Sequence, residues 1–157
     1  GRKIFLPATT LDKYCYSFLF HACEALTKAP DLPATKLKER CYDQMFSSCI
    51  ALTEAPVMTA TTLAIACCYS MFYGCTSFEK APDLLASTVV KNCYYDIFAT
   101  CSSLNYVKCL ATDVSADNCL GGWLDGISAT GTLVVASGTT WAVAGTNYPS
   151  GWTVTKE

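Results

Sequence analysis

The stretch LKERCYDQMFSSCIALTEAP, residues 37–56, contains the unit from which most of this chain is built. Its two cysteines, Cys41 and Cys49, each belong to a series that recurs every 26 residues. The first series is Cys15, Cys41, Cys67, Cys93 and Cys119, and the second is Cys23, Cys49, Cys75 and Cys101. Apolar residues such as Leu37 and Leu52 recur with the same period. Repetition at a fixed period of this length indicates a repeat architecture.

Within the unit, the apolar residues have the spacing of one face of an α-helix. Leu37, Cys41 and Met45 are four residues apart and Phe46 follows, which gives an i, i+4, i+8, i+9 pattern. The position two residues before the leucine column always holds a side chain that can cap a helix N-terminus. These residues are Thr9, Thr35, Thr61, Ser87 and Asp113. The sequence C-x-x-L-x-x-A-P at 49–56 then predicts a short strand, because proline cannot donate to a β-ladder.

The fold predicted from this unit is an α/β repeat solenoid similar to leucine-rich repeats, with one short strand and one helix per unit. Residues 1–127 contain about five units, of which the first is incomplete and the fifth is degenerate. Residues 128–157 differ in kind, since 132–136 and 152–155 read as strands separated by turns rich in serine, glycine and threonine. We expect this segment to form a small β cap over the last unit, because a stack of repeats exposes its core at each end.

The motif M-F-x-x-C-x-x-L occurs at 45–52, and a close copy that ends in phenylalanine occurs at 71–78. It resembles the BspA-like leucine-rich repeats of bacterial cell-surface proteins, and the resemblance covers roughly residues 4–127. It implies a curved solenoid that acts as a non-catalytic recognition or adhesion module. It also implies a cell-surface or secreted location, with a signal or anchor expected upstream of Gly1. It assigns no contact residue, because the matching positions are all core positions.

The eleven cysteines are open to three interpretations. The paired columns lie eight residues apart, whereas zinc sites generally use cysteines two to four apart, so we expect no metal and no cofactor. Disulfides within units are disfavoured, because the fifth unit keeps Cys119 but has Ile127 at the partner position. A cysteine that exchanges with isoleucine behaves as a small buried hydrophobe. We therefore expect mostly reduced, stacked core cysteines, with one or more disulfides as the alternative.

Several classes of function are disfavoured by the sequence. We do not expect an enzyme, because the chain has none of the common catalytic motifs and its one histidine, His21, lies in a variable column. A net charge of −2 does not favour nucleic-acid binding. No apolar run reaches the length of about 18 residues that a transmembrane helix needs, so we expect no membrane span.

Two variable columns between the core positions are expected to line the concave face, which is the usual binding surface of a solenoid. They are Thr27, Thr53, Glu79 and Asn105, and Lys28, Glu54, Lys80 and Tyr106. The partner that we expect there is an unknown host or bacterial surface protein. The alternation of Lys28, Glu54 and Lys80 is equally typical of a self-compensating, solvated ladder of charges.

Two other functions are alternatives to protein binding: a structural spacer that displays another domain, and a glycan-binding surface module. Only Tyr106 supplies an aromatic ring in the two columns, which weakens the glycan hypothesis. The first unit has few residues before it to cover its core. We therefore expect either an N-terminal cap that is missing from this chain, or an end-to-end dimer through the first units.

Overall fold

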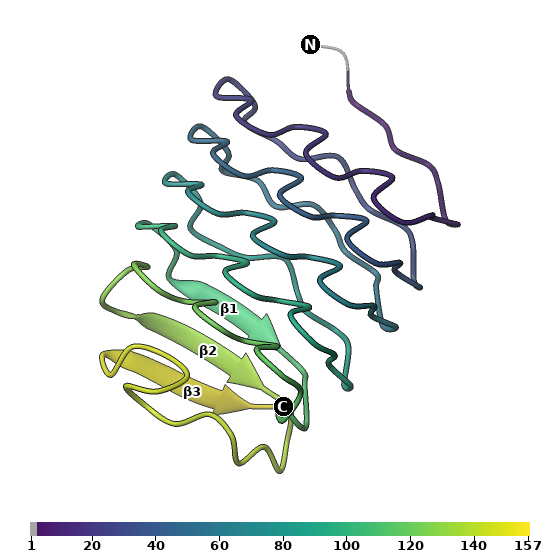
Figure 1. Cartoon of the computed structure of the whole chain (residues 1–157). Coiled ribbons are helices and arrows are strands. Elements are labelled where there is room, and N and C mark those ends of the chain that lie inside the picture. Colours follow the sequence, from purple (N-terminus) through teal and green to yellow (C-terminus); the bar gives the residue numbers. More distant parts are fainter. Residues whose placement is uncertain (1–2) are drawn as a thin grey trace.

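A computed structural model describes residues 3–157, which wind as a stack of coils in which each residue lies close to one about 26 positions further along (Figure 1). Each coil consists of a run of consecutive tight turns and an extended segment that forms parallel bridges. The turn runs are residues 12–23, 38–49, 64–75, 90–101 and 116–127. The bridge segments are residues 27–37, 53–63, 79–89 and 105–114.

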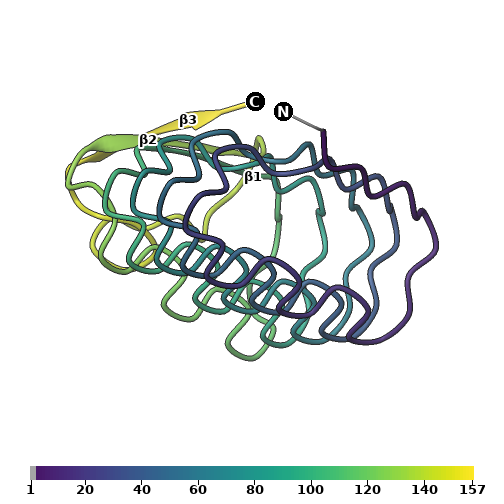
Figure 2. The same cartoon turned by 90° about the horizontal axis from the view of Figure 1, so that it is seen from above.

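The regular elements are three short strands, β1 (Tyr106–Cys109), β2 (Gly131–Val135) and β3 (Trp152–Lys156). They form one parallel sheet in the order β1-β2-β3. Figure 2 shows β2 and β3 on the side of the stack opposite the turn runs. The described residues contain no helix, so the predicted α/β solenoid of leucine-rich-repeat type, with one helix per unit, is wrong.

The turn runs cannot be helical because every fourth residue has a positive φ. In the second run these residues are Arg40, Gln44 and Ser48, with φ of 51°, 51° and 62°. A right-handed helix requires negative φ throughout, whereas type II turns need a positive φ at their third position. The backbone therefore repeats every four residues, so Cys41, Met45 and Cys49 all point to the same side. This four-residue repeat is close to the 3.6-residue period of a helix, which is why the sequence pattern predicts a helix.

The backbone amides of each turn run alternate between two kinds of acceptor. Odd-numbered amides stay within the run, as when the Cys41 amide donates to the Lys38 carbonyl oxygen at 3.2 Å. Even-numbered amides donate to the next coil, as when the Tyr42 amide donates to the Cys67 carbonyl oxygen at 2.9 Å. We call these bonds between coils the amide ladder; they join all five turn runs and all point the same way along the stack. The ladder gives hydrogen-bond partners to backbone N–H and C=O groups that, in a helix, would bond to each other within the helix.

The residues expected to cap helices have other roles. The carbonyl oxygen of Thr35 accepts the amides of Thr61 and Thr62 from the next coil, at 3.0 and 3.1 Å. Asp113 accepts the Ser115 amide through Oδ1 at 2.8 Å. The prediction of helix N-caps is therefore wrong in its structural role, although these residues do lie where the chain turns.

The core is made of columns that run through the stack. Met45, Phe46, Cys49 and Leu52 are fully buried, and so are their equivalents in the next two coils. A column of phenylalanine rings runs along the axis, with Phe46 and Phe72 stacked at 5.4 Å between centroids. In the first coil the same columns are only partly covered, and Cys15, Leu19 and Cys23 are exposed.

All eleven cysteines are free thiols, and nine of them are buried. In the second column each buried thiol donates a hydrogen bond to the phenylalanine carbonyl oxygen of the preceding coil. Cys75 Sγ, for example, lies 3.2 Å from the Phe46 carbonyl oxygen, and Cys101 Sγ lies 3.0 Å from that of Phe72. A thiol therefore fits this column because it is small and apolar and also carries a weak donor.

The register of the repeat shifts by one residue in the fourth bridge segment. Leu84 pairs with Cys109 and Thr88 pairs with Asp113, which is one residue fewer than in the earlier coils. Cys109 is fully buried in the position expected for Leu110, which is only half-buried. A strict 26-residue period through Leu32, Met58 and Leu84 would continue to Leu110, so the period is broken here. The shift explains why Cys109 lies outside the two main cysteine series.

The last residues cover the end of the stack with three tryptophan side chains. Each indole Nε1 donates to a backbone carbonyl oxygen: Trp123 to Asn147, Trp141 to Ala111 and Trp152 to Ser128, at 2.7, 2.8 and 2.8 Å. The first two bonds tie residues 128–157 to the fifth turn run and to the fourth bridge segment, and the third lies within residues 128–157. Among the described residues, the structure contains no helix that is long and apolar enough to cross a bilayer.

Candidate protein-binding groove

The eight residues expected to form a binding surface lie on or next to the bridge segments, but they do not form one continuous row. Two parallel bridges join them in pairs, Lys28 with Glu54 and Lys80 with Tyr106. The ammonium group of Lys28 forms an ion pair with Glu54, and that of Lys80 lies 4.9 Å from the ring centroid of Tyr106. The expected ladder of alternating charges therefore stops at Glu54. Lys80 does not continue it, because its ammonium group lies over the ring of Tyr106 in the next coil.

The break between these pairs extends along the whole bridge segment. The first two bridge segments are joined by bonds such as those from the Ala29 and Leu37 amides to the Glu54 and Thr62 carbonyl oxygens, at 3.1 and 2.8 Å. The third and fourth are joined in the same way, for example from the Ala81 amide to the Tyr106 carbonyl oxygen at 3.0 Å. Between residues 53–63 and 79–89, within the part of the chain that the structure describes, there is neither a bridge nor a backbone hydrogen bond. We call this break the seam.

The seam is confined to one side of the stack. Across the same two coils, the amide ladder is complete: the Gln44 amide donates to the Tyr69 carbonyl oxygen at 2.8 Å, and the Phe46 amide donates to that of Met71 at 2.9 Å. The coils are thus held together at their turn runs and are unpaired at their bridge segments. Backbone groups that pair elsewhere in the stack, such as the amide of Ala55, therefore have no partner in the neighbouring coil.

A groove of about 540 Å³ lies over the seam. Its lining comes from both sides of the break: residues 53–59, residues 80–83 and Leu85. Val57 is 63% exposed, whereas Met58 beside it is buried. Two prolines, Pro56 and Pro82, also line the groove and cannot donate backbone hydrogen bonds across it. The groove is therefore largely apolar, with charged side chains at its rim.

The structure brings only part of the expected site to this groove. Thr53, Glu54 and Lys80 line it, whereas the other five expected residues do not: Thr27, Lys28, Glu79, Asn105 and Tyr106. Four of these five, all except Lys28, take part in backbone hydrogen bonds between coils instead. The Glu79 carbonyl oxygen accepts the Asn105 and Tyr106 amides, and the Asn105 carbonyl oxygen accepts that of Thr132. Pairing within the sheet therefore explains part of the two columns.

One position in the repeat distinguishes the groove in the sequence. Val57 corresponds to Asp31 and Asp83 in the neighbouring units, so an apolar residue replaces a charged one in the unit between them. That substitution was the available signal, but drift between repeats produces similar changes. His21 is exposed and in the first coil, and residues 3–157 contain no cluster of three or more potential metal ligands.

Comparison with family models, with curated proteins and with solved structures found no match to this chain. The resemblance to BspA-like repeats therefore still rests on its motif alone. The fold part of that description, a leucine-rich-repeat solenoid, is overturned by the absence of helices from residues 3–157. Its other parts, an adhesive role and a bacterial cell surface, have no support in the structure or in these comparisons.

Hydrogen exchange can test the seam with matched amides. Ala29, Ala55 and Ala81 occupy the same column and each precedes a proline, but only the amides of Ala29 and Ala81 have a backbone acceptor in the next coil. We expect the Ala55 amide to exchange roughly tenfold faster than the other two, or more, because no bond must open first. Equal protection of the three alanines, measured by NMR, would show that the seam is closed in solution.

Proposed function

We propose that the chain is a non-catalytic recognition module that binds an extended segment of a partner protein in the groove at the seam. The observation that carries this proposal is that residues 53–63 and 79–89 form no backbone hydrogen bonds with each other across the seam, although each segment pairs with the coil on its other side. An extended peptide presents alternating carbonyl oxygens and amides, and it can add to such an edge as a further strand. The exposed side chain of Val57 and the wall at Leu85 offer apolar contacts for its side chains.

A protein ligand fits this groove better than a glycan. Sugar rings favour an aromatic platform, and the residues that line the groove include no aromatic side chain. The ring of Tyr106, in the next coil, lies against the ammonium group of Lys80. The rim also carries both signs of charge, on Glu54, Lys80 and Asp83, which suits a peptide more than a neutral sugar.

A peptide with the sequence of residues 79–89, EKAPDLLASTV, is a suitable probe, because this segment already pairs with a neighbouring coil in the stack. We expect it to bind the folded chain, and Val57→Asp to weaken binding at least about tenfold by placing a charge in the apolar part of the groove. Val143→Asp is the matched control, since Val143 is also exposed, at 51%, but lies far from the seam in the sequence and outside the groove lining. Isothermal titration calorimetry would measure both affinities.

Three results would argue against the proposal. Equal binding to the Val57→Asp variant would place the peptide elsewhere. Binding of carbohydrates on a glycan array, without peptide binding, would favour the glycan module. No binding of this peptide or of a random decapeptide library would favour the structural spacer.

A further inference from the structure

The amide ladder ends at the fifth turn run, residues 116–127. This run keeps the conformation of the others, with positive φ at Asn118, Gly122 and Gly126. Its odd-numbered amides also donate within the run, as when the Asp125 amide donates to the Gly122 carbonyl oxygen at 3.0 Å. Its even-numbered amides must therefore point away from the fourth coil, along the direction that the ladder has in every preceding coil.

These amides lack the acceptors that their equivalents have. In the fourth run, the amides of Asp96 and Phe98 donate to the carbonyl oxygens of Gly121 and Trp123 in the fifth, at 2.8 and 3.2 Å. No backbone or side-chain acceptor within residues 3–157 serves the corresponding amides of the fifth run. We define these donors as the amide row: the backbone N–H groups of Leu120, Gly122, Leu124 and Gly126.

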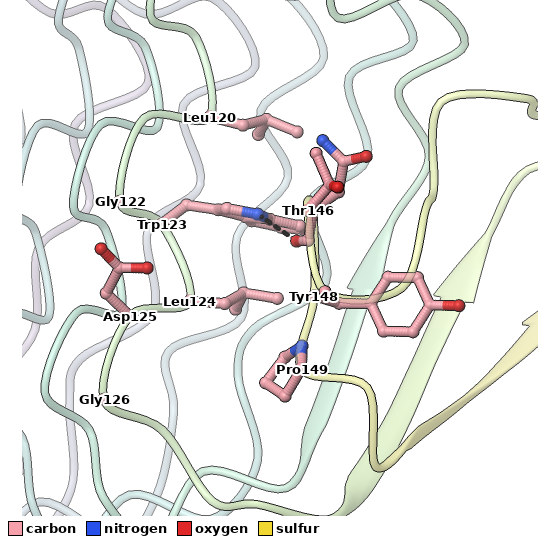
Figure 3. Close-up of a pocket in the computed structure, with 11 residues that line it drawn as sticks. Leu120, Gly122, Trp123, Leu124, Asp125, Gly126, Thr146, Tyr148 and Pro149 are labelled. Carbon is pink, nitrogen blue, oxygen red and sulfur yellow. Dashed lines mark hydrogen bonds between the residues drawn. The ribbon is translucent and has the colours of Figure 1, made fainter.

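A pocket of about 300 Å³ adjoins the amide row. This volume is within the range of sites that hold small ligands. Residues 145–149 form its other wall. Figure 3 shows the side chains of Trp123 and Leu124 directed toward that segment, and the Trp123 indole bound to the Asn147 carbonyl oxygen. Leu124 and Pro149 form an apolar wall beside the row of donors, whereas Figure 3 shows the Tyr148 ring directed away from Trp123 and Leu124.

The amide row offers donors only, two residues apart. The edge of a β-strand presents N–H groups as well as carbonyl oxygens, so it would bring donors against donors in this pocket. A proline-rich segment has carbonyl oxygens but no N–H groups at its prolines. Its polyproline II conformation also docks on apolar surfaces, and the side chains of Leu124 and Pro149 offer such a surface here.

An anion would satisfy the same donors, but two carboxylates oppose it. A β-carbon added to Gly122 would clash with Asp96 Oδ1 and would lie 3.6 Å from Asp125 Oδ2, so both carboxylates lie beside the row. Burial raises the pKa of Asp96, and the Asp125 carboxylate raises it further. Figure 3 shows Asp125 directed away from Trp123 and Tyr148, so the carboxylate leaves the apolar wall free.

We propose that this pocket binds a proline-rich segment of a partner protein, whose carbonyl oxygens accept hydrogen bonds from the amide row. This site lies at the end of the stack, formed by the fifth run and residues 145–149, and shares no residue with the groove at the seam. It is therefore independent of the proposed function. The row selects for acceptors without donors, and the wall of Leu124 and Pro149 offers contacts for the apolar rings.

The test is an NMR titration of the whole chain with acetylated hexaproline amide. The four amides of the row should shift progressively, while the alternate amides of Gly121, Trp123 and Asp125 shift much less, because these already donate within the run. Hexaglycine, which carries N–H groups, should produce smaller shifts. Pro149→Ala should weaken hexaproline binding several-fold, whereas Pro7→Ala, at an exposed position before the first turn run, should leave it unchanged.

Three outcomes would overturn the proposal. The absence of shifts at millimolar hexaproline would mean that only water occupies the pocket. Shifts of equal size in the amide row and in the amides of Gly121, Trp123 and Asp125 would mean that the ligand does not bond specifically to the row. Shifts with inorganic phosphate but not with hexaproline would identify an anion site.

Discussion

Replacement of Phe72 by alanine is expected to destabilise the folded chain by about 3–5 kcal/mol, the usual cost of removing a buried phenylalanine ring. Phe72 is fully buried in the middle of the stack. Its ring lies 5.4 Å from that of Phe46, 5.1 Å from that of Phe78 and 5.8 Å from that of Phe98, measured between centroids. The cavity would have coils on both sides, and the backbone of each is fixed by the amide ladder, so little collapse can fill it.

The matched control is Phe20→Ala in the same column. Phe20 is only half-buried, and its ring stacks on one phenylalanine, Phe46, at 5.4 Å. We expect this change to cost roughly half as much as Phe72→Ala or less, because less apolar area leaves water on folding. Urea unfolding of both variants, analysed by linear extrapolation, would measure the difference. Equal costs would contradict the structure, since they would mean that the first coil is as well covered as the third.

The thiols of the native chain are expected to fall into two groups that differ by orders of magnitude in reactivity. Cys15 and Cys23 are exposed, and the other nine cysteines are buried. Burial raises the pKa of Cys41 and of Cys49 to about 12. The unfolded value is about 8.5, so the thiolate fraction of these buried groups at pH 8 is lower by a factor on the order of a thousand. Ellman's reagent should therefore titrate two thiols rapidly, and the remainder only after unfolding.

The double variant Cys15→Ser, Cys23→Ser provides the control, since it should remove the rapid phase and leave the slow one. The raised pKa values also predict an alkaline loss of stability. Below about pH 8.5 the thiols are protonated in both states, so their contribution is complete. As the pH rises toward about 12, the unfolded chain ionises first, so the free energy of unfolding falls. A denatured, unreduced chain with fewer than eleven free thiols would show that disulfides are present after all.

Much of the packing could be predicted from the sequence, but the backbone conformation could not. The 26-residue columns identify Met45, Phe46 and Leu52 as core, because burial depends on the repeat and not on the path of the chain between columns. Four-residue spacing fits a short helix about as well as a run of turns. In a helix of 3.6 residues per turn, side chains four residues apart differ in direction by only about 40°. The signal that separates them is the residue type in the positive-φ columns.

Those columns include residues that tolerate a left-handed conformation. Asn92, Asp96 and Asn118 have φ of 54°, 50° and 49°, and glycine occupies three other positions of the positive-φ columns, at 74, 122 and 126. Other members, such as Arg40 and Phe18, obscure the pattern, because L-residues of these types rarely adopt such angles. The hydrogen bonds of the amide ladder compensate for the strain of these residues. These bonds between coils cannot be predicted from the composition of the chain.

The candidate site was predictable in position but not in extent. The expected columns do lie on the bridge segments, and Thr53, Glu54 and Lys80 do line the groove. The seam itself could not be anticipated, since 28–32 and 80–84 share the sequence KAPDL and yet the structure pairs each of them with only one neighbouring coil. A sequence repeat predicts that all neighbouring bridge segments pair in the same way, but the second and third bridge segments do not pair.

The common direction of the amide ladder gives the stack an electrical polarity. Each peptide unit carries a dipole of about 3.5 D, and dipoles aligned head to tail add, as they do in a helix. Here the aligned units lie in successive coils, so the fifth run forms a positive pole of N–H groups and the first run a negative pole of carbonyl oxygens. In the described residues, the carbonyl groups of Cys15, Ser17 and Leu19 accept no amide from another coil. Two first coils brought face to face would therefore oppose negative poles, so the expected end-to-end dimer would have to rely on side chains such as Tyr14 and Phe18 alone.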